Sequence, residues 1–204
     1  YLSKPFSANE EDVVTYSEII AFHSRVLALF NKLYIRSFMA DMPYIDAKQI
    51  YTIDPLMRNE HRKDNISHFK NNFYNAEGFE MYSFLEKLID SYILAALPKW
   101  IISKGEPFLV PLLDLIDTLF GYGLISYEFC RPLLRNLYLI SETTKSIEIS
   151  SAETDLQPEI RAKCKAEFVR CREKMSSILV HIFTLICDVS LEESITHYRP
   201  NNNN

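Results

Sequence analysis

The stretch Phe108-Leu-Val-Pro-Leu-Leu-Asp-Leu-Ile-Asp-Thr-Leu-Phe-Gly-Tyr-Gly123 decides the fold of this chain. Apolar residues occupy most of its positions up to residue 120, which is typical of a helix buried on more than one side. Two glycines then interrupt it, and glycine adopts backbone conformations that other residues avoid. The stretch therefore predicts a buried helix that ends in a tight break.

Two further helices are predicted on the C-terminal side of this break. The first follows Ser126, a possible cap, and runs to about residue 140, with Pro132 predicting a late start or a kink. We interpret 141–157, rich in Ser, Thr and Glu, as a polar linker. The next helix spans 158–189, because its apolar residues recur at steps of four and three. They are Ile160, Cys164, Phe168, Cys171, Met175, Ile178, Ile182 and Leu185.

The N-terminal side carries two more amphipathic patterns. Residues 12–38 and 79–97 each place apolar side chains on one stripe, which predicts two helices. Residues 44–57 contain Pro55 and predict only a turn or two of helix. Residues 58–78 are rich in Asn and charge, so we expect a polar loop that precedes the second helix.

These patterns together favour an all-α fold. Nothing in the chain demands a strand, and long helices joined by short breaks are typical of stacked helical layers. We predict an armadillo- or HEAT-like solenoid segment of irregular, antiparallel helices. It forms a single domain over residues 1–189, followed by a flexible tail at 190–204 that ends in four asparagines.

The composition excludes several function classes. Only 4 of 204 residues are glycine, and none lies in a phosphate-binding or dinucleotide-binding pattern, which disfavours a nucleotide enzyme. The net charge is −5, from 22 Lys and Arg against 27 Asp and Glu, without the basic stripe of a nucleic-acid-binding protein. Signal-peptide and membrane-span patterns are not found, so we expect a soluble piece. From the start at Tyr1 without Met, we expect a fragment or a processed piece.

The four cysteines do not form a ligand pattern. Cys130, Cys164, Cys171 and Cys187 lack the spacing of a zinc site, and the last three fall on or near one predicted helix. Cysteines seven apart on a helix are about 10 Å apart along its axis, which is too far for a disulfide. We expect reduced, buried thiols.

Four histidines and one sequon are candidate sites. His61 and His68 lie in the predicted loop, where surface histidines are the better interpretation than zinc ligands. His23 and His181 fall in helices, where a core or boundary position is favoured over a ligand or base. Asn65-Ile-Ser67 matches a glycosylation sequon, which we regard as accidental.

Two pairs of residues that include carboxylates are further candidates. Asp114 and Asp117 face one way on the apolar helix, where contact with solvent or with a neighbouring Lys or Arg is favoured over catalysis. Glu193 and His197 are four apart, but they lie at the end of the chain, where no core fixes their geometry. We therefore predict no catalytic, cofactor-binding or metal residue, and a protein that is not an enzyme.

The order of several segments resembles inositol 1,4,5-trisphosphate receptors. Leu27-Ala-Leu-Phe-Asn-Lys-Leu-Tyr-Ile-Arg36 followed by Pro43 resembles a helix and its proline-bearing exit, and Phe84-Leu-Glu-Lys-Leu-Ile-Asp90 with Pro98 resembles the next helix. Leu112-Leu-Asp-Leu-Ile-Asp-Thr-Leu-Phe-Gly-Tyr-Gly123, running into Tyr127-Glu-Phe-Cys-Arg-Pro-Leu-Leu-Arg135, is similar to the family's helix, break and leucine-rich helix. With 164–186, the resemblance spans most of residues 24–186.

This resemblance implies a cytosolic, armadillo-like block of a calcium-release channel. In that family the block lies between the ligand-binding head and the pore, and it couples ligand binding to gating without catalysis or a cofactor. Its partners would be other domains of the same chain and neighbouring subunits of a homotetramer, at the cytosolic face of the endoplasmic reticulum or another calcium-store membrane. A relation to ryanodine receptors stays open.

The alternative is an adaptor of a different class. Helical repeats also bind peptides or partner helices, and Trp100 and the 12 tyrosines could anchor such an interface. A groove lined by Asn and Tyr would favour this armadillo- or HEAT-like interaction module over the channel segment.

Overall fold

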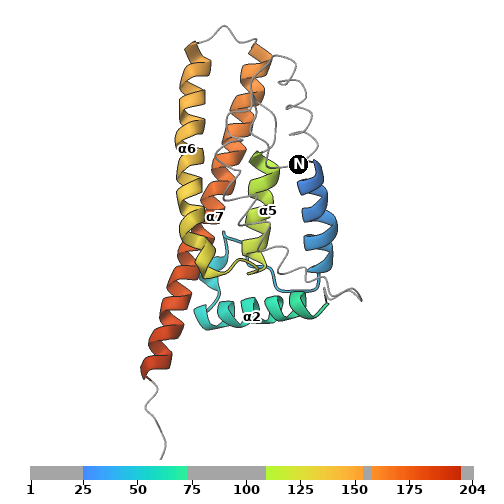
Figure 1. The fold of residues 1–204 in the computed structure, drawn as a ribbon, viewed down its shortest axis with the longest axis vertical. Coiled ribbons are helices and arrows are strands. Elements are labelled where there is room, and N and C mark those ends of the chain that lie inside the picture. Colours follow the sequence, from blue (N-terminus) through green and yellow to red (C-terminus); the bar gives the residue numbers. More distant parts are fainter. Residues whose placement is uncertain (1–24, 73–108, 154–157, 199–204) are drawn as a thin grey trace, which may run out of the picture.

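The computed structural model describes residues 25–72, 109–153 and 158–198 (Figure 1). Within these ranges the regular structure is helical and no strand occurs, which confirms the all-α prediction. Residues 12–24 of the first predicted helix and all of the helix predicted at 79–97 lie outside the described residues. His23 and Trp100 lie outside them as well.

Helix α5 (Leu109–Gly121) is the buried helix that the opening stretch predicts. Side chains from 112 to 120 are buried apart from half-buried Asp114. The predicted break is a Schellman motif: Leu124 N–H donates to Leu119 O and Gly123 N–H donates to Phe120 O, both at 2.8 Å. Gly123 has φ = +67°, a value that favours glycine.

Helix α6 (Cys130–Glu153) follows a 3-10 turn, η4 (Tyr127–Phe129). The polar linker predicted at 141–157 is wrong, because the helix continues to residue 153. Pro132 lies in the first turn of α6, where a missing N–H breaks no helical hydrogen bond. Ser126 precedes η4, but its side chain does not cap the backbone.

Helix α7 (Pro158–Tyr198) is 41 residues long, which corresponds to about 60 Å. It starts where predicted but runs nine residues beyond 189, so the flexible tail predicted at 190–204 is wrong for 190–198. Figure 1 shows α6 and α7 side by side and antiparallel, with α5 packed against α7. The lower end of α7 extends past α2.

Helix α2 spans Pro55–Asn72. The polar loop predicted at 58–78 is therefore wrong for residues 58–72, which are helical. At the N-terminus of α2, the Asp54 side chain accepts a hydrogen bond from Leu56 N–H at 2.9 Å. Pro55 occupies the first helical position, which proline favours. A short 3-10 turn, η2 (Ile50–Thr52), precedes it. Figure 1 shows α2 lying across the lower part of the molecule, beneath α5 and the helix drawn in blue.

Residues 25–38 form the remaining described helix, whose winding is unusual. Residues 25–29 are α-helical, whereas η1 (Phe30–Arg36) is a π-helix. This helix lies beside α5, and Phe38 at its end contacts the rings of His68 and Phe69 on α2.

One core joins these helices. Its fully buried members come from every described helix and include Ile35, Met39, Phe69, Leu113, Leu115, Leu119, Ile140, Cys171, Ile178 and Ile182. The core lies around α5 and the middle of α7, and it places polar side chains at the two positions described next.

Candidate functional site

The first polar junction forms around Asp114 on α5. Asn31 Nδ2 donates to Asp114 Oδ2 at 2.9 Å, and Arg36 Nη2 lies 3.3 Å from the same oxygen. On the other side of α5, Lys174 Nζ lies 2.7 Å from Asp114 Oδ1. One carboxylate therefore contacts helix 25–38 and α7 at once.

Asp117, also on α5, belongs to the same junction and contacts α7. Its carboxylate accepts hydrogen bonds from Ser177 Oγ at 2.5 Å and from Lys174 Nζ at 3.2 Å. Burial opposes the charged form of Lys174, but hydrogen bonds and charges of Asp114 and Asp117 outweigh it and raise the pKa of the ammonium. Lys174 thus stays charged between two carboxylates, and the predicted contact of the aspartates with a neighbouring Lys or Arg is confirmed.

His181 on α7 lies next to Asp117 on the buried side of these contacts. The side chain is 3% exposed, its ring stacks on Phe120, and its Nε2 lies 3.9 Å from Asp117 Oδ1. Burial lowers the pKa of His181 to about 4, against the opposing charge of Asp117. The predicted core position is confirmed, and Nε2 is buried without a hydrogen-bond partner.

The second polar junction joins α2 to α7. Asp188 is 1% exposed and receives Arg58 at both oxygens, with Nε–Oδ2 at 2.8 Å and Nη2–Oδ1 at 2.6 Å. Arg62 Nη1 lies 2.7 Å from Oδ2. Arg58 also donates to the carbonyls of Ile50 and Ile53, which satisfies the end of η2.

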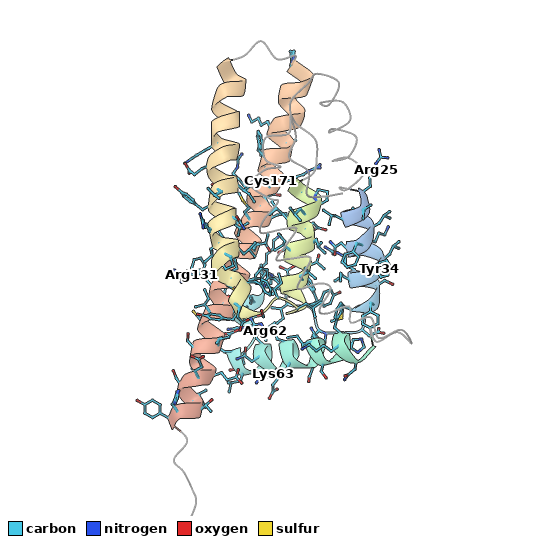
Figure 2. The ribbon with its side chains drawn as sticks, in the orientation of Figure 1. Arg25, Tyr34, Arg62, Lys63, Arg131 and Cys171 are labelled. Carbon is cyan, nitrogen blue, oxygen red and sulfur yellow. The ribbon has the colours of Figure 1, made fainter. Side chains whose placement is uncertain are left out.

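Charges and hydrogen bonds set the ionisation of this second junction. Burial opposes the anion, but hydrogen bonds and charges from Arg58 and Arg62 hold the pKa of Asp188 below its ordinary value. The polar loop predicted over 58–78 is therefore wrong at Arg62, whose side chain is 11% exposed and pairs with buried Asp188. Figure 2 shows Arg62 where α2 meets α7.

Further polar contacts of α2 surround this junction: Asn59 and Lys63 contact α7, whereas Asn65 contacts the backbone before α2 and after α5. Asn59 Nδ2 donates to Asp188 O at 3.2 Å, and Lys63 contacts Glu192. Asn65, 1% exposed, donates to the carbonyls of Pro43 and Tyr122 at 2.8 and 2.9 Å. The nitrogen that glycosylation would modify is thus occupied in the fold, which agrees with an accidental sequon.

The other candidate residues do not converge on a site. His61 and His68 are half-buried on α2, and Glu193 and His197 are exposed on the last turns of α7. Within the described residues, no group of three His, Cys, Asp or Glu side chains is arranged to hold a metal ion. Lys174 occupies the position between the two aspartates where a cation would bind.

The cysteines whose side chains are described form no disulfide. Cys130 and Cys171 are buried as expected, whereas Cys187 is exposed, so the expectation of buried thiols is wrong for Cys187; the side chain of Cys164 is not among those described. Burial raises the pKa of the Cys130 thiol to about 11, so this thiol stays protonated at neutral pH.

Segment Phe168–Tyr198 of α7 is long and apolar enough to cross a membrane, judged by length and composition alone. This differs from the expectation that the chain holds no such run. A core helix passes the same test, and part of this segment is buried against α5, α6 and α2.

Sequence reasoning missed the partners of both junctions. Asn31, Lys174 and Ser177 gave no pattern in the sequence. Asp188 did give a signal, because it is the lone Asp, Glu, Lys or Arg between Lys174 and Glu192. A single charge in an apolar helix is seldom buried unless it is paired.

Comparison of the chain with family models, with curated proteins and with solved structures finds no match.

Proposed function

We propose that this chain is a non-catalytic helical coupling block, in which the helices form layers of an armadillo-like solenoid. The observation that supports this function is the buried pairing of Asp188 with Arg58 and Arg62. Removing one partner of such a buried pair leaves an uncompensated charge and costs about 3–5 kcal/mol. A displacement of α7 is therefore transmitted to α2 rather than absorbed between them.

The Asp114 junction supports the same function at a second position. It connects helix 25–38, α5 and α7 through Arg36, Asp114 and Lys174. The two junctions lie at different heights of α7, since Lys174 and Asp188 are 14 residues apart, or about 21 Å along the helix. Two separated attachments resist rotation of α7 better than one.

The resemblance of residues 24–186 to inositol trisphosphate receptors supports a specific form of this proposal. In that form the block belongs to the cytosolic part of a calcium-release channel and couples ligand binding to gating. Its partners are other domains of the same chain and neighbouring subunits of a homotetramer, at the face of a calcium-store membrane. The block requires no cofactor for this role.

Calcium release by the full-length protein in membrane vesicles tests this form. We expect Asp188→Asn to preserve binding of labelled inositol trisphosphate while reducing ligand-evoked calcium release. Glu193→Gln is the matched control, because it removes one exposed carboxylate from the same helix. Equal release by both variants, or no ligand-evoked release by the wild-type protein, contradicts the channel form.

The outer face of α7 favours a second candidate, an adaptor that binds a partner helix. Phe183, Leu191, Ile195 and Tyr198 are 41–87% exposed and recur at steps of four and three beside exposed Cys187. Such stripes are used in helix recognition. The full-length sequence of the natural protein discriminates the two: several membrane spans with a pore loop outside residues 1–204 support the channel, and their absence supports the adaptor.

A further inference from the structure

Helix 25–38 buries its side chains with an unusual period. Its core-facing residues Leu27, Asn31 and Ile35, and Met39 after its end, are each four apart. An α-helix turns about 100° per residue, so each step of four drifts by about 40° and three steps drift by about 120°. The π winding of Phe30–Arg36 compensates for this drift, because its hydrogen bonds connect residues five apart.

Contacts with α5 depend on this winding. Asn31 and Arg36 both bind Asp114, and both also bind Thr118 Oγ1, at 3.2 and 2.8 Å. Residues five apart in an α-helix point about 140° away from each other and could not share these partners. Figure 2 shows Tyr34, which lies between them in sequence, pointing outward from the same helix. The π winding and the contacts with Asp114 and Thr118 therefore stabilise each other.

The segment carries one residue more than an α-helix would need. Removal of one residue between Asn31 and Ile35 changes the buried spacing from four, four, four to four, three, four, which is the ordinary stripe of an α-helix. Inserted π turns are rare and are often found at functional sites. This extra residue gives the helix two possible registers.

We propose that Phe30–Arg36 is a register switch controlled by Asp114. In the observed register Leu27 and Asn31 face α5 and Ala28 is exposed. In the second register the segment is α-helical, Ile35 and Met39 keep their places, and the preceding turn rotates so that Ala28 faces α5. The inference rests on the coupling function, because Asp114 also binds Lys174 and so senses the position of α7.

The test measures thiol labelling of Ala28→Cys, with Leu29→Cys as the matched control. Both residues are exposed in the observed register, but only position 28 turns inward in the second. Trypsin cleaves after Arg25 and Lys32, so mass spectrometry of the peptide 26–32 reads these thiols separately from the native cysteines. Labelling of each cysteine variant is measured in the wild-type background, with Asp114→Ala, with deletion of Leu33, and with both changes together.

We expect Asp114→Ala to slow labelling at position 28 about tenfold, because the buried thiol reacts only after local opening, and to leave position 29 unchanged. Deletion of Leu33 removes the extra residue, so position 28 then labels fast with or without Asp114. Unchanged labelling at position 28 in folded Asp114→Ala overturns the switch. Equal acceleration at both positions also overturns it, since it indicates local unfolding.

A second variant keeps the test possible if Asp114→Ala does not fold. If Asp114→Ala lacks the helical circular dichroism of the wild-type protein, Thr118→Val removes the other shared partner with almost no change in volume, and the same outcomes apply. Failure of the switch is distinct from failure of the coupling function, because the calcium-release assay with Asp188→Asn does not involve helix 25–38.

Discussion

Arg58 and Asp188, 130 residues apart in sequence, form a buried two-point ion pair with N–O distances of 2.6 and 2.8 Å. Arg62 adds a second cation on the same carboxylate. This pairing explains how a helix as polar as α2 packs against α7, because the polar groups that face α7 find partners there. Because both arginines share Asp188, we expect substitution of Asp188 to lower stability more than substitution of any other single residue of the junction.

We expect Asp188→Asn to lower the free energy of unfolding by about 3–5 kcal/mol, since the buried guanidinium of Arg58 and the part-buried guanidinium of Arg62 lose their counter-charge. Urea unfolding followed by circular dichroism measures the loss. Lys63→Ala is the control, because its pair with Glu192 is exposed and should contribute less than about 1 kcal/mol. Similar losses in the two variants would show that the Asp188 pair is not the dominant attachment.

Buried His181 should make stability depend on pH. Its pKa is about 4 in the fold and about 6.5 when unfolded, so between these values the unfolded chain binds the additional proton. Stability therefore falls as pH decreases from 6.5 to 4, by roughly 3 kcal/mol at about 1.36 kcal/mol per pKa unit. Unfolding at a series of pH values checks this slope.

His181→Leu is the matched variant for this pH series, because it keeps an apolar volume and removes the titrating group. Its stability should be flatter between pH 6.5 and 4. The lowered pKa of Asp188 contributes a separate loss, which begins only when pH falls below the unfolded value of a carboxyl group, near 4. An unchanged slope in the variant would assign the pH dependence to other groups.

The break after α5 should not accept a side chain at Gly123. An added Cβ would lie 2.4 Å from Arg62 Cγ and 3.1 Å from its Cα, and φ is +67°. We expect Gly123→Ala to lower stability by more than about 1 kcal/mol in thermal or urea unfolding.

Gly121→Ala is the informative comparison for this glycine. Its Cβ would lie 2.2 Å from Cε2 of the Tyr44 ring, while no positive φ is involved. Shortening Tyr44 to Ala in the same chain should therefore recover part of the loss. If Gly123→Ala costs no more than Gly121→Ala with Tyr44→Ala, the conformational argument at 123 is wrong.

Thiol reactivity should follow burial. We expect Cys187 to react rapidly with iodoacetamide at neutral pH, whereas Cys130 and Cys171 react only after unfolding, because they are 1% and 0% exposed. The raised pKa of Cys130, about 11, further reduces its thiolate population. Mass spectrometry of native and urea-treated protein measures the three rates, and fast native labelling of Cys130 or Cys171 would contradict the packing of α6 on α7.

The apolar elements were predictable because their pattern is local. The run from 112 to 120 predicts α5, and the paired glycines predict its end, since only a few residue types suit a helix stop with positive φ. The errors share one cause. Residues 58–72, 141–153 and 190–198 are polar enough to be predicted as loop, linker and tail, yet all three are helical.

Tertiary contacts explain at least two of these errors. Arg58, Asn59 and Arg62 are polar residues that meet a buried carboxylate on α7, so burial of α2 costs little unpaired polarity. Glu192 likewise meets Lys63 and Asn59, which holds the end of α7 against α2. No periodicity within either segment indicates these partners, because each lies more than 120 residues away in the chain.

The sequence by itself determined that the described chain is helical, where α5 lies and where it breaks, because hydrophobic period and glycine placement act over a few residues. Only the tertiary structure decided which polar residues are buried, and why residues 30–36 adopt a π winding. Those outcomes depend on Asp114 and Asp188, each of which meets side chains from distant segments. Ion pairing and burial are properties of such meetings, and they are absent from the local pattern of any one helix.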